Sequence, residues 1–143
     1  MAVLERLRAG GHQAYVVGGS LRDLLLHRPP ADWDVATDAR PPVVTALFPG
    51  SRAVARFGTV LIPGIDDRQQ VEVTTFRRDH HYGDHRRPDR VTFTTSLAED
   101  LARRDFTINA MALGPEGLVD PHGGQADLGR RLVRAVGDPA VRF

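Results

Sequence analysis

The apolar residues of the chain occur in short groups that have either helical or strand spacing. Val3, Leu4 and Leu7 have helical spacing and predict a short amphipathic helix over 1–8, which ends at a pair of glycines. Similar patterns predict helices over 20–26, 41–48, 96–103 and 127–131, and strands over 15–17, 53–57, 59–62, 70–76, 110–113, 118–119 and 132–136. No repeat or linker divides these elements, so the 143 residues are expected to form one domain around one core.

The strand over 15–17 runs into a glycine pair and then a helix. Gly18 and Gly19 allow the backbone to turn tightly or to approach another group closely. Ser20 is expected to be the N-cap of the helix, with the acidic residue three positions on as its capping-box partner. Free N–H groups at the helix start, the positive end of the helix dipole and the Arg22 guanidinium together suit a phosphate group.

Two aspartates follow this helix at a spacing of two. In an extended segment Asp32 and Asp34 share one face, while Trp33 points the other way, toward the core. Glu72 faces away from the valines on either side of it in the strand over 70–76, so it either joins the aspartates or lies on a solvated face. Carboxylates beside a phosphate cradle are what Mg²⁺-assisted phosphoryl or nucleotidyl transfer needs, with Glu72 as a third ligand or a base. An isolated D-x-D pattern is, however, also common outside metal sites.

The segment 77–89 is rich in arginine, histidine and aspartate and has almost no aliphatic residue, so it is expected to form a long polar loop. Its three histidines, His80, His81 and His85, together with two aspartates, leave a zinc site open as an alternative. Two of these histidines are adjacent and no ordered fourth ligand is evident, so a functional polar loop is the preferred interpretation.

The net charge of the chain excludes few classes of protein. The chain has 19 basic and 18 acidic residues and a net charge of +1, which predicts no strong non-specific attraction to nucleic acid. All 19 basic residues are arginines, which favours bidentate contacts to phosphate or carboxylate where they cluster, although genomic base composition explains the same bias. For Arg103 and Arg104, the residues alone favour compensation of the dipole at a helix C-terminus.

Composition also excludes some classes of site. The chain has no cysteine, so neither a disulfide framework nor a thiolate metal site is possible. No apolar run approaches the ~18 residues of a membrane span, and no secretory signal precedes the fold. A cytoplasmic location without membrane contact is therefore expected.

Seven motifs, taken in order, resemble the bacterial tRNA nucleotidyltransferase and poly(A) polymerase family, the class II CCA-adding type. They are V-V-G-G-S-L-R-D-L-L-L at 16–26, D-W-D at 32–34, V-E-V-T-T-F-R at 71–77, Y-G-D-H-R-R-P at 82–88, R-R-D-F-T-I-N-A-M-A at 103–112, D-P-H-G-G-Q-A-D-L at 120–128 and R-A-V-G-D-P at 134–139. The resemblance covers nearly the whole chain. It implies an α+β fold of the polymerase-β-like nucleotidyltransferase head, with a mixed, mainly antiparallel sheet of about five to seven strands flanked by short helices.

The resemblance also assigns roles to individual residues. It implies that Asp32 and Asp34 are the Mg²⁺ ligands, and that Glu72 belongs to the strand of the third carboxylate. The residues implied to bind the nucleoside triphosphate are Gly19 and Arg22, supported by Gly18 and Ser20, together with Arg104, Asp105 and Asn109 for phosphate and ribose. The polar segment matches a loop that influences nucleotide choice and holds the primer end, with Arg86 and Arg87 as its phosphate contacts.

The activity implied is transfer of a nucleotide from CTP or ATP to the 3′ end of tRNA, with release of pyrophosphate. In the family the chain continues after 137–139 into a neck helix, whose E-D-x-x-R motif reads the base, and then into body and tail domains that grip tRNA. The 143 residues are therefore expected to be a single head domain, either excised or naturally minimal, with no other protein partner evident. The alternatives left open are a nucleotide-binding module that is inactive alone or acts in trans, a poly(A) polymerase acting on other RNA, and a small metallophosphohydrolase.

Overall fold

The computed structural model of the chain describes residues 2–54, 58–64, 69–80 and 90–137. The helices are α1 (Ala2–Ala9), α2 (Gly18–Leu25), α3 (Pro41–Leu47), α4 (Leu97–Ala102), the 3₁₀ turn η2 (Thr107–Asn109) and α5 (Gly124–Gly129). The strands are β1 (Ala14–Val17), β2 (Trp33–Thr37), β3 (Arg52–Ala53), β4 (Thr59–Ile62), β5 (Val71–Thr75), β6 (Arg77–His80), β7 (Arg90–Phe93), β8 (Ala112–Gly114) and β9 (Gly117–Val119). None of the described helices has the length and apolar content needed to span a membrane.

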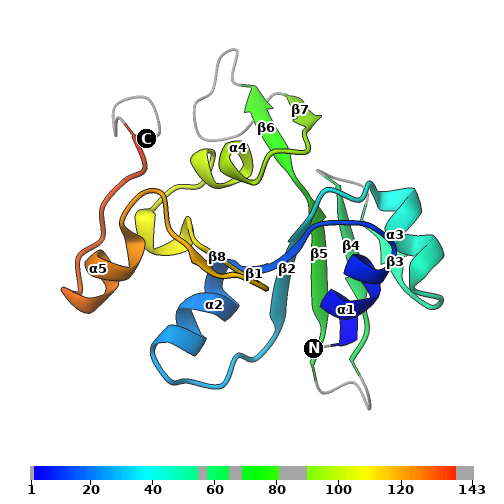
Figure 1. Ribbon diagram of the computed structural model, residues 1–143, viewed down its shortest axis with the longest axis horizontal. Coiled ribbons are helices and arrows are strands. Elements are labelled where there is room, and N and C mark those ends of the chain that lie inside the picture. The colour runs from blue at the N-terminus through cyan, green and yellow to red at the C-terminus, as the bar shows by residue number, and fades with distance from the viewer. Residues whose placement is uncertain (1, 55–57, 65–68, 81–89, 138–143) are drawn as a thin grey trace.

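Seven of the strands form one mixed sheet in the order β3-β4-β5-β2-β1-β8-β9, and β6 pairs with β7 in a separate ribbon. Within the sheet, β2 and β5 are parallel, whereas every other neighbouring pair is antiparallel. Short helices flank the sheet, and the ribbon extends away from it beside α4 (Figure 1). The expected α+β architecture, a mixed and mainly antiparallel sheet with short helices, is therefore confirmed.

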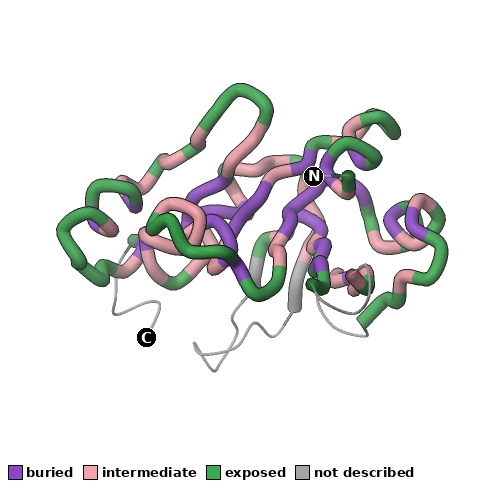
Figure 2. The backbone as a smooth tube through the Cα atoms, turned by 90° about the horizontal axis from the view of Figure 1, so that it is seen from below, coloured by how far each residue is buried: buried purple, intermediate pink, exposed green. Residues whose placement is uncertain are grey.

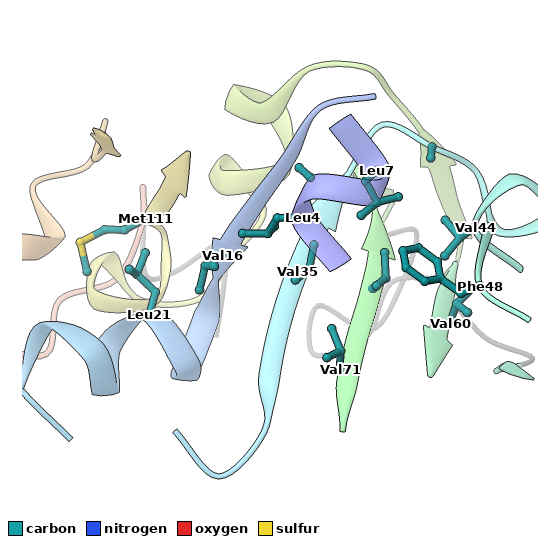
Figure 3. Close-up of a cluster of buried hydrophobic side chains, with 13 residues drawn as sticks. Leu4, Leu7, Val16, Leu21, Val35, Val44, Phe48, Val60, Val71 and Met111 are labelled. Carbon is teal, nitrogen blue, oxygen red and sulfur yellow. The ribbon is translucent and has the colours of Figure 1, made fainter. Parts of the chain in front are cut away.

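The two faces of the sheet are covered differently. One face packs against α1, α2 and α3 in the larger core cluster (Figure 3), whose labelled members are Leu4, Leu7, Val16, Leu21, Val35, Val44, Phe48, Val60, Val71 and Met111. The opposite face has a smaller cluster beneath α4, formed by Val17, Ala36, Phe76, Leu101 and Ala112. Buried residues follow the central strands, and the loops at the periphery are exposed (Figure 2). Alternation along β2 and β5 consequently places Asp34 and Glu72 on the less covered face.

The start of α2 differs from the sequence prediction. Ser20 is not the N-cap: Val17 takes that position, and the helix begins at Gly18, two residues earlier than expected. Ser20 is buried in the first turn, where its hydroxyl donates to the carbonyl of Val17 (2.9 Å) and accepts from the amide of Asp34 (3.0 Å). The helix begins early because Gly18 adopts a φ of +63°, which turns the chain directly out of the strand. Ser20 thus connects α2 to β2 instead of capping the helix.

Two other predictions need correction. The first four residues of the expected loop over 77–89 form strand β6, which pairs with β7, while 81–89 lie outside the described residues. The strand expected over 132–136 does not form; this segment has only an isolated bridge between Phe106 and Ala135. The polar ribbon was missed because it has no aliphatic alternation to reveal a strand. Within 132–136 only Val136 is buried, whereas Leu132 and Val133 remain exposed, so this segment does not have the buried face of a strand.

The remaining elements agree more closely with the sequence. The predicted strand over 53–57 is represented by β3, although 55–57 lie outside the described residues. The helix predicted over 96–103 is α4, and Ser96 caps it, because its hydroxyl accepts from the amide of Glu99 at 3.2 Å. The strands predicted over 59–62, 70–76, 110–113 and 118–119 form the antiparallel pairs β4–β5 and β8–β9.

Asp127 joins three segments near the C-terminal end of the described chain. Its carboxylate, 1% exposed, accepts from the Thr107 hydroxyl at 2.6 Å and from Nε of Arg134 at 2.9 Å. The hydrogen bond from Thr107, with a further contribution from Arg134, lowers the pKa of Asp127 in spite of its burial. Asp127 therefore fixes η2 against α5 in its ionised form.

We expect Asp127→Asn to lower the free energy of unfolding at neutral pH and to weaken its dependence on acid. Because folding lowers the pKa of Asp127, its contribution is fully present above the unfolded-state pKa of roughly 3.9 and is lost as pH falls through the folded-state value. Urea unfolding at pH 7 and at a series of values below about pH 5 measures both effects. Glu116→Gln removes the same charge from the exposed β8–β9 turn and should resemble the wild type. A wild-type acid profile in Asp127→Asn would contradict this expectation.

Candidate active site

A cavity of about 550 Å³ lies on the face of the sheet opposite the larger core cluster. Its floor comes from β2, β4 and β5, and its walls come from the start of α2 and from the segment that joins α4 to η2. The polar residues that line it are Arg22, Asp34, Thr59, Glu72, Thr74, Arg77, Arg103, Arg104, Asp105 and Asn109, together with Gly18 and Gly19. The strand order brings these distant parts of the sequence to one place.

Asp34 and Glu72 form the acidic part of the floor. They are partners in the parallel β2–β5 register, and their side chains are within hydrogen-bonding reach of each other. Burial, then the neighbouring Asp34 and to a smaller degree Asp32, raises the pKa of Glu72. Two carboxylates in contact must share a proton or have a cation between them. The pair therefore offers hard oxygen donors for a metal ion, or a carboxylate able to accept a proton.

The start of α2 holds Asp34 from one side. A Cβ added to Gly18 would lie 3.1 Å from Oδ2 of Asp34, and the positive φ at this residue is rarely adopted by other residue types. The amide of Ser20 donates to the same oxygen at 3.4 Å. Gly19 follows at the cavity wall, close to the guanidinium of Arg22. The glycine pair is thus needed for the close approach of helix and carboxylate.

The opposite wall is basic. Arg103 and Arg104, whose side chains are each 15% exposed, both contact the buried carboxylate of Asp100. Burial lowers the pKa of Arg104 more than the neighbouring Asp100 raises it. The Nε of Arg104 is buried and has no hydrogen-bond partner among the residues that the structure describes. A guanidinium with an unused donor at a cavity wall suits an anionic ligand with several oxygens, such as a phosphate.

Asp105 and Asn109 lie beside this basic wall, at the two ends of a short turn. The Asp105 carboxylate accepts from the amide of Phe106 at 2.7 Å and from Nδ2 of Asn109 at 3.4 Å. Oδ1 of Asn109 is buried and has no partner within the described part of the chain. A buried acceptor beside an exposed carboxylate is suited to a ligand hydroxyl.

Asp32 is placed differently from Asp34. It is exposed, lies just before β2 and does not line the cavity. Its Oδ1 accepts from the amide of Gln70 at 3.1 Å, which turns part of the carboxylate toward the start of β5. Trp33 is half-buried against the larger core cluster, as the alternation predicts. The role of Asp32 as a metal ligand stays a prediction.

The acidic residues supply part of a metal site. Among the side chains that the structure describes, no group of three or more His, Asp or Glu converges closely enough to hold a metal ion by itself. Asp34 and Glu72 supply two carboxylates instead, and Mg²⁺ commonly takes one or two carboxylates and completes its coordination with water and substrate phosphate. The residues therefore fit an ion that is shared with a phosphate ligand.

The structure brings most of the predicted site residues together. Gly18, Gly19, Arg22, Asp34, Glu72, Arg104, Asp105 and Asn109 line one cavity, whereas Ser20 contacts Asp34 from behind and Asp32 lies outside. Arg86 and Arg87 lie outside the described residues, as do two of the three histidines proposed for zinc, His81 and His85.

Sequence reasoning missed Thr59, Thr74, Arg77 and Asp100. The hydroxyls of Thr59 and Thr74 lie 3.2 Å apart on the floor, and strand alternation from Glu72 was the signal for Thr74. Asp100 precedes Arg103 and Arg104 by three and four positions, the helical spacing at which opposite charges meet. That spacing could have identified the cluster.

The chain is similar to known proteins over most of its length. The family model described as the Poly A polymerase head domain matches residues 14–134. The CCA-adding enzyme of Anoxybacillus flavithermus is 50% identical over an alignment that covers 100% of this chain and 36% of that protein. The CCA-adding enzyme of Geobacillus thermodenitrificans is 48% identical, with 100% and 35% covered. The chain thus spans about a third of the length of the curated relatives that it matches.

Solved structures are similar over the same region. The CCA-adding enzyme of Bacillus stearothermophilus in complex with CTP matches with a TM-score of 0.85 and 42% identity, over 99% of this chain and 34% of that one. The CCA-adding enzyme of Thermotoga maritima complexed with tRNA matches with a TM-score of 0.70 and 26% identity, over 95% and 31%. These similarities confirm the predicted resemblance and the nucleotidyltransferase head fold. The chain belongs to the Poly A polymerase head domain family.

Proposed function

We propose that this chain is the catalytic head of a template-independent nucleotidyltransferase that adds nucleotides from CTP or ATP to the 3′ end of tRNA. The observation that carries the proposal is the meeting of the Asp34–Glu72 pair with the half-buried Arg103 and Arg104 in one cavity. The choice of substrates is supported by the relatives, one of which was solved with CTP and another with tRNA.

The nucleoside triphosphate would lie between the start of α2 and the basic wall. In this arrangement the backbone at Gly19 and the guanidinium groups of Arg22 and Arg104 bind phosphate oxygens. Asp105 and Asn109 contact a ribose hydroxyl, for which the unpartnered Oδ1 of Asn109 is an available acceptor. Unsatisfied buried polar atoms thereby gain partners when the substrate binds.

In the reaction, the 3′-hydroxyl oxygen of the RNA attacks the α-phosphorus of the bound nucleotide. A bond forms between these two atoms while the bond from the α-phosphorus to the bridging oxygen of the β-phosphate breaks, and pyrophosphate leaves. Glu72 has a raised pKa and is placed either to accept the hydroxyl proton or to serve as a ligand beside Asp34. Arg22 and Arg104 stabilise the negative charge that develops on the departing pyrophosphate.

The nucleotidyltransferases of this family depend on a metal ion, and we propose Mg²⁺ as that ion here. Asp34 and Glu72 are the residues that would hold it, with Asp32 as the additional ligand that the D-x-D pattern predicts. When bound, Mg²⁺ orients the attacking hydroxyl and neutralises charge on the transferred phosphate. The proposed site of action is the cytoplasm, where tRNA and nucleotides are available.

The test is to measure binding and incorporation side by side. We expect the chain to bind CTP and ATP in the presence of Mg²⁺ by calorimetry, and a tRNA that lacks its terminal CCA to gain labelled nucleotide, with one pyrophosphate released for each addition. Release of free phosphate from nucleotide without RNA extension would favour a phosphohydrolase. Failure to bind either nucleotide would overturn the proposal.

A second candidate is a nucleotide-binding module that needs another part of a longer protein for chemistry. It is favoured by one fact, that the chain spans only about a third of its relatives. This candidate predicts CTP and ATP binding without incorporation by the chain, and incorporation when the part of a relative that lies outside the aligned region is supplied. Extension of RNAs other than tRNA in the same assay would indicate poly(A) polymerase activity.

A further inference from the structure

Asp100 lies directly behind the basic wall of the cavity. Its side chain is 1% exposed and does not line the cavity, whereas its three hydrogen-bonding partners do. Oδ1 accepts from the backbone amide of Arg77 at 3.0 Å and from Nε of Arg103 at 3.3 Å, and Oδ2 accepts from Nη2 of Arg104 at 3.1 Å. One buried carboxylate therefore connects α4, the start of β6 and both arginines.

We propose that Asp100 is a positioning residue that orders Arg103 and Arg104 for the triphosphate. The inference rests on the proposed function, because it assumes that these arginines bind phosphate. An arginine side chain loses rotamer freedom when it binds a ligand, and a guanidinium already held in place loses less. The contact with the Arg77 amide fixes the carboxylate to the backbone where β5 passes into β6, so the arginines are set relative to the sheet that carries Asp34 and Glu72.

The contact with Asp100 leaves Arg104 able to bind a ligand. A guanidinium has five N–H donors, and the contact with Asp100 is made by one nitrogen of Arg104. That nitrogen is Nη2, while Nε remains without a partner in the described part of the chain. Asp100 thus holds the Arg104 guanidinium at one position and leaves another donor for a phosphate oxygen.

The charge of Asp100 and its positioning role predict opposite effects on CTP affinity when that charge is removed. A carboxylate close to the arginines repels a triphosphate, so removing its charge should strengthen binding if charge were its only influence. If Asp100 acts by positioning, removing its charge should weaken binding, because the arginines are no longer ordered. The sign of the change in CTP affinity therefore separates the two.

The experiment measures binding of CTP, CMP and cytidine to the chain in the presence of Mg²⁺ by calorimetry. We expect Asp100→Asn to weaken CTP binding by roughly 10- to 100-fold, since two charge-assisted hydrogen bonds are impaired. The loss should be smaller for CMP and negligible for cytidine, which has no phosphate. A purely structural defect would weaken binding of all three ligands alike.

Glu99→Gln is the matched control. Glu99 is the preceding residue on the same helix, carries the same charge and does not line the cavity; its carboxylate lies 2.9 Å from Nε of Arg78. Glu99→Gln should therefore bind CTP as the wild type does. A double-mutant cycle adds a second test: in an Arg103→Ala, Arg104→Ala background, Asp100→Asn should have little further effect on CTP affinity.

Asp100→Glu is a second variant, which can be measured if Asp100→Asn does not fold. It retains the charge but moves the carboxylate, so positioning predicts weaker CTP binding, while a charge effect predicts wild-type affinity. Wild-type or tighter CTP binding in either Asp100 variant would overturn this inference and leave the proposed function intact. Absence of CTP binding by the unaltered chain would overturn the proposed function itself.

Discussion

Asp34→Asn is expected to reduce nucleotide incorporation by at least roughly 1000-fold, since a metal ion contributes several kcal/mol to the stabilisation of a phosphoryl-transfer transition state. Of the two aspartates in the D-x-D pattern, Asp34 is the one that lines the cavity; it meets Glu72 in register and accepts from the amide of Ser20. The substitution preserves shape and removes the charge needed to hold a cation. The measurement is the rate of labelled CMP addition to tRNA lacking its CCA end, under single-turnover conditions.

CTP affinity is measured as well as the rate, so that the prediction can be tested even if the chain by itself does not incorporate nucleotide. CTP affinity should rise with Mg²⁺ in the wild type and should become insensitive to Mg²⁺ in Asp34→Asn. Asp38→Asn is the control, because Asp38 follows the same strand, lies outside the cavity and accepts from the amide of Gln13 at 3.0 Å. If Asp34→Asn incorporated nucleotide at the wild-type rate, or kept the Mg²⁺ response of the wild type, Asp34 would not be a ligand of the metal ion.

Much of the fold could be predicted because its elements carry local signals. The alternation along β5 and the apolar spacing of α1 each show which side chains face the core. The pairing of β2 with β5 has no such signal, because α3, β3 and β4 lie between the two strands along the described part of the chain and their parallel register is decided by packing. That register, which places Asp34 opposite Glu72, is what forms the acidic floor.

A residue of the candidate site could be predicted where a sequence motif identifies it. It could not be predicted where tertiary contacts decide its role. Gly19 and Arg22 line the cavity as the glycine-helix pattern indicates. Ser20 has the chemistry of an N-cap, yet burial and the conformation of the preceding glycine direct its hydroxyl to Asp34. Asp100 carries no sign in the sequence that it is buried, because only packing removes α4 from solvent and makes a carboxylate there depend on arginine partners.

Replacing Gly124 or Gly129 by alanine is expected to change the free energy of unfolding in opposite directions, which is the largest contrast in stability that we predict. Gly124 begins α5, and a Cβ there would lie 2.0 Å from the carbonyl oxygen of Thr107. Because that oxygen belongs to the backbone, Gly124→Ala must displace η2 or α5, and we expect it to lower the free energy of unfolding by about 1–3 kcal/mol. At Gly129, at the other end of α5, an added Cβ would have no atom of the other described residues outside its own helix backbone within 4 Å, so Gly129→Ala should raise stability by roughly 0.5–1 kcal/mol.

Urea unfolding of both variants separates the clash from the general effect of replacing glycine in a helix, since the two changes are chemically identical and occur in the same six-residue element. The clash also has a functional consequence, because Thr107 lies between Asp105 and Asn109 at the cavity wall. Displacement of this turn should weaken CTP binding in Gly124→Ala and leave it unchanged in Gly129→Ala. Equal stability of the two variants would show that α5 can move away from η2 without loss, and that the turn between Asp105 and Asn109 does not depend on this helix for its position.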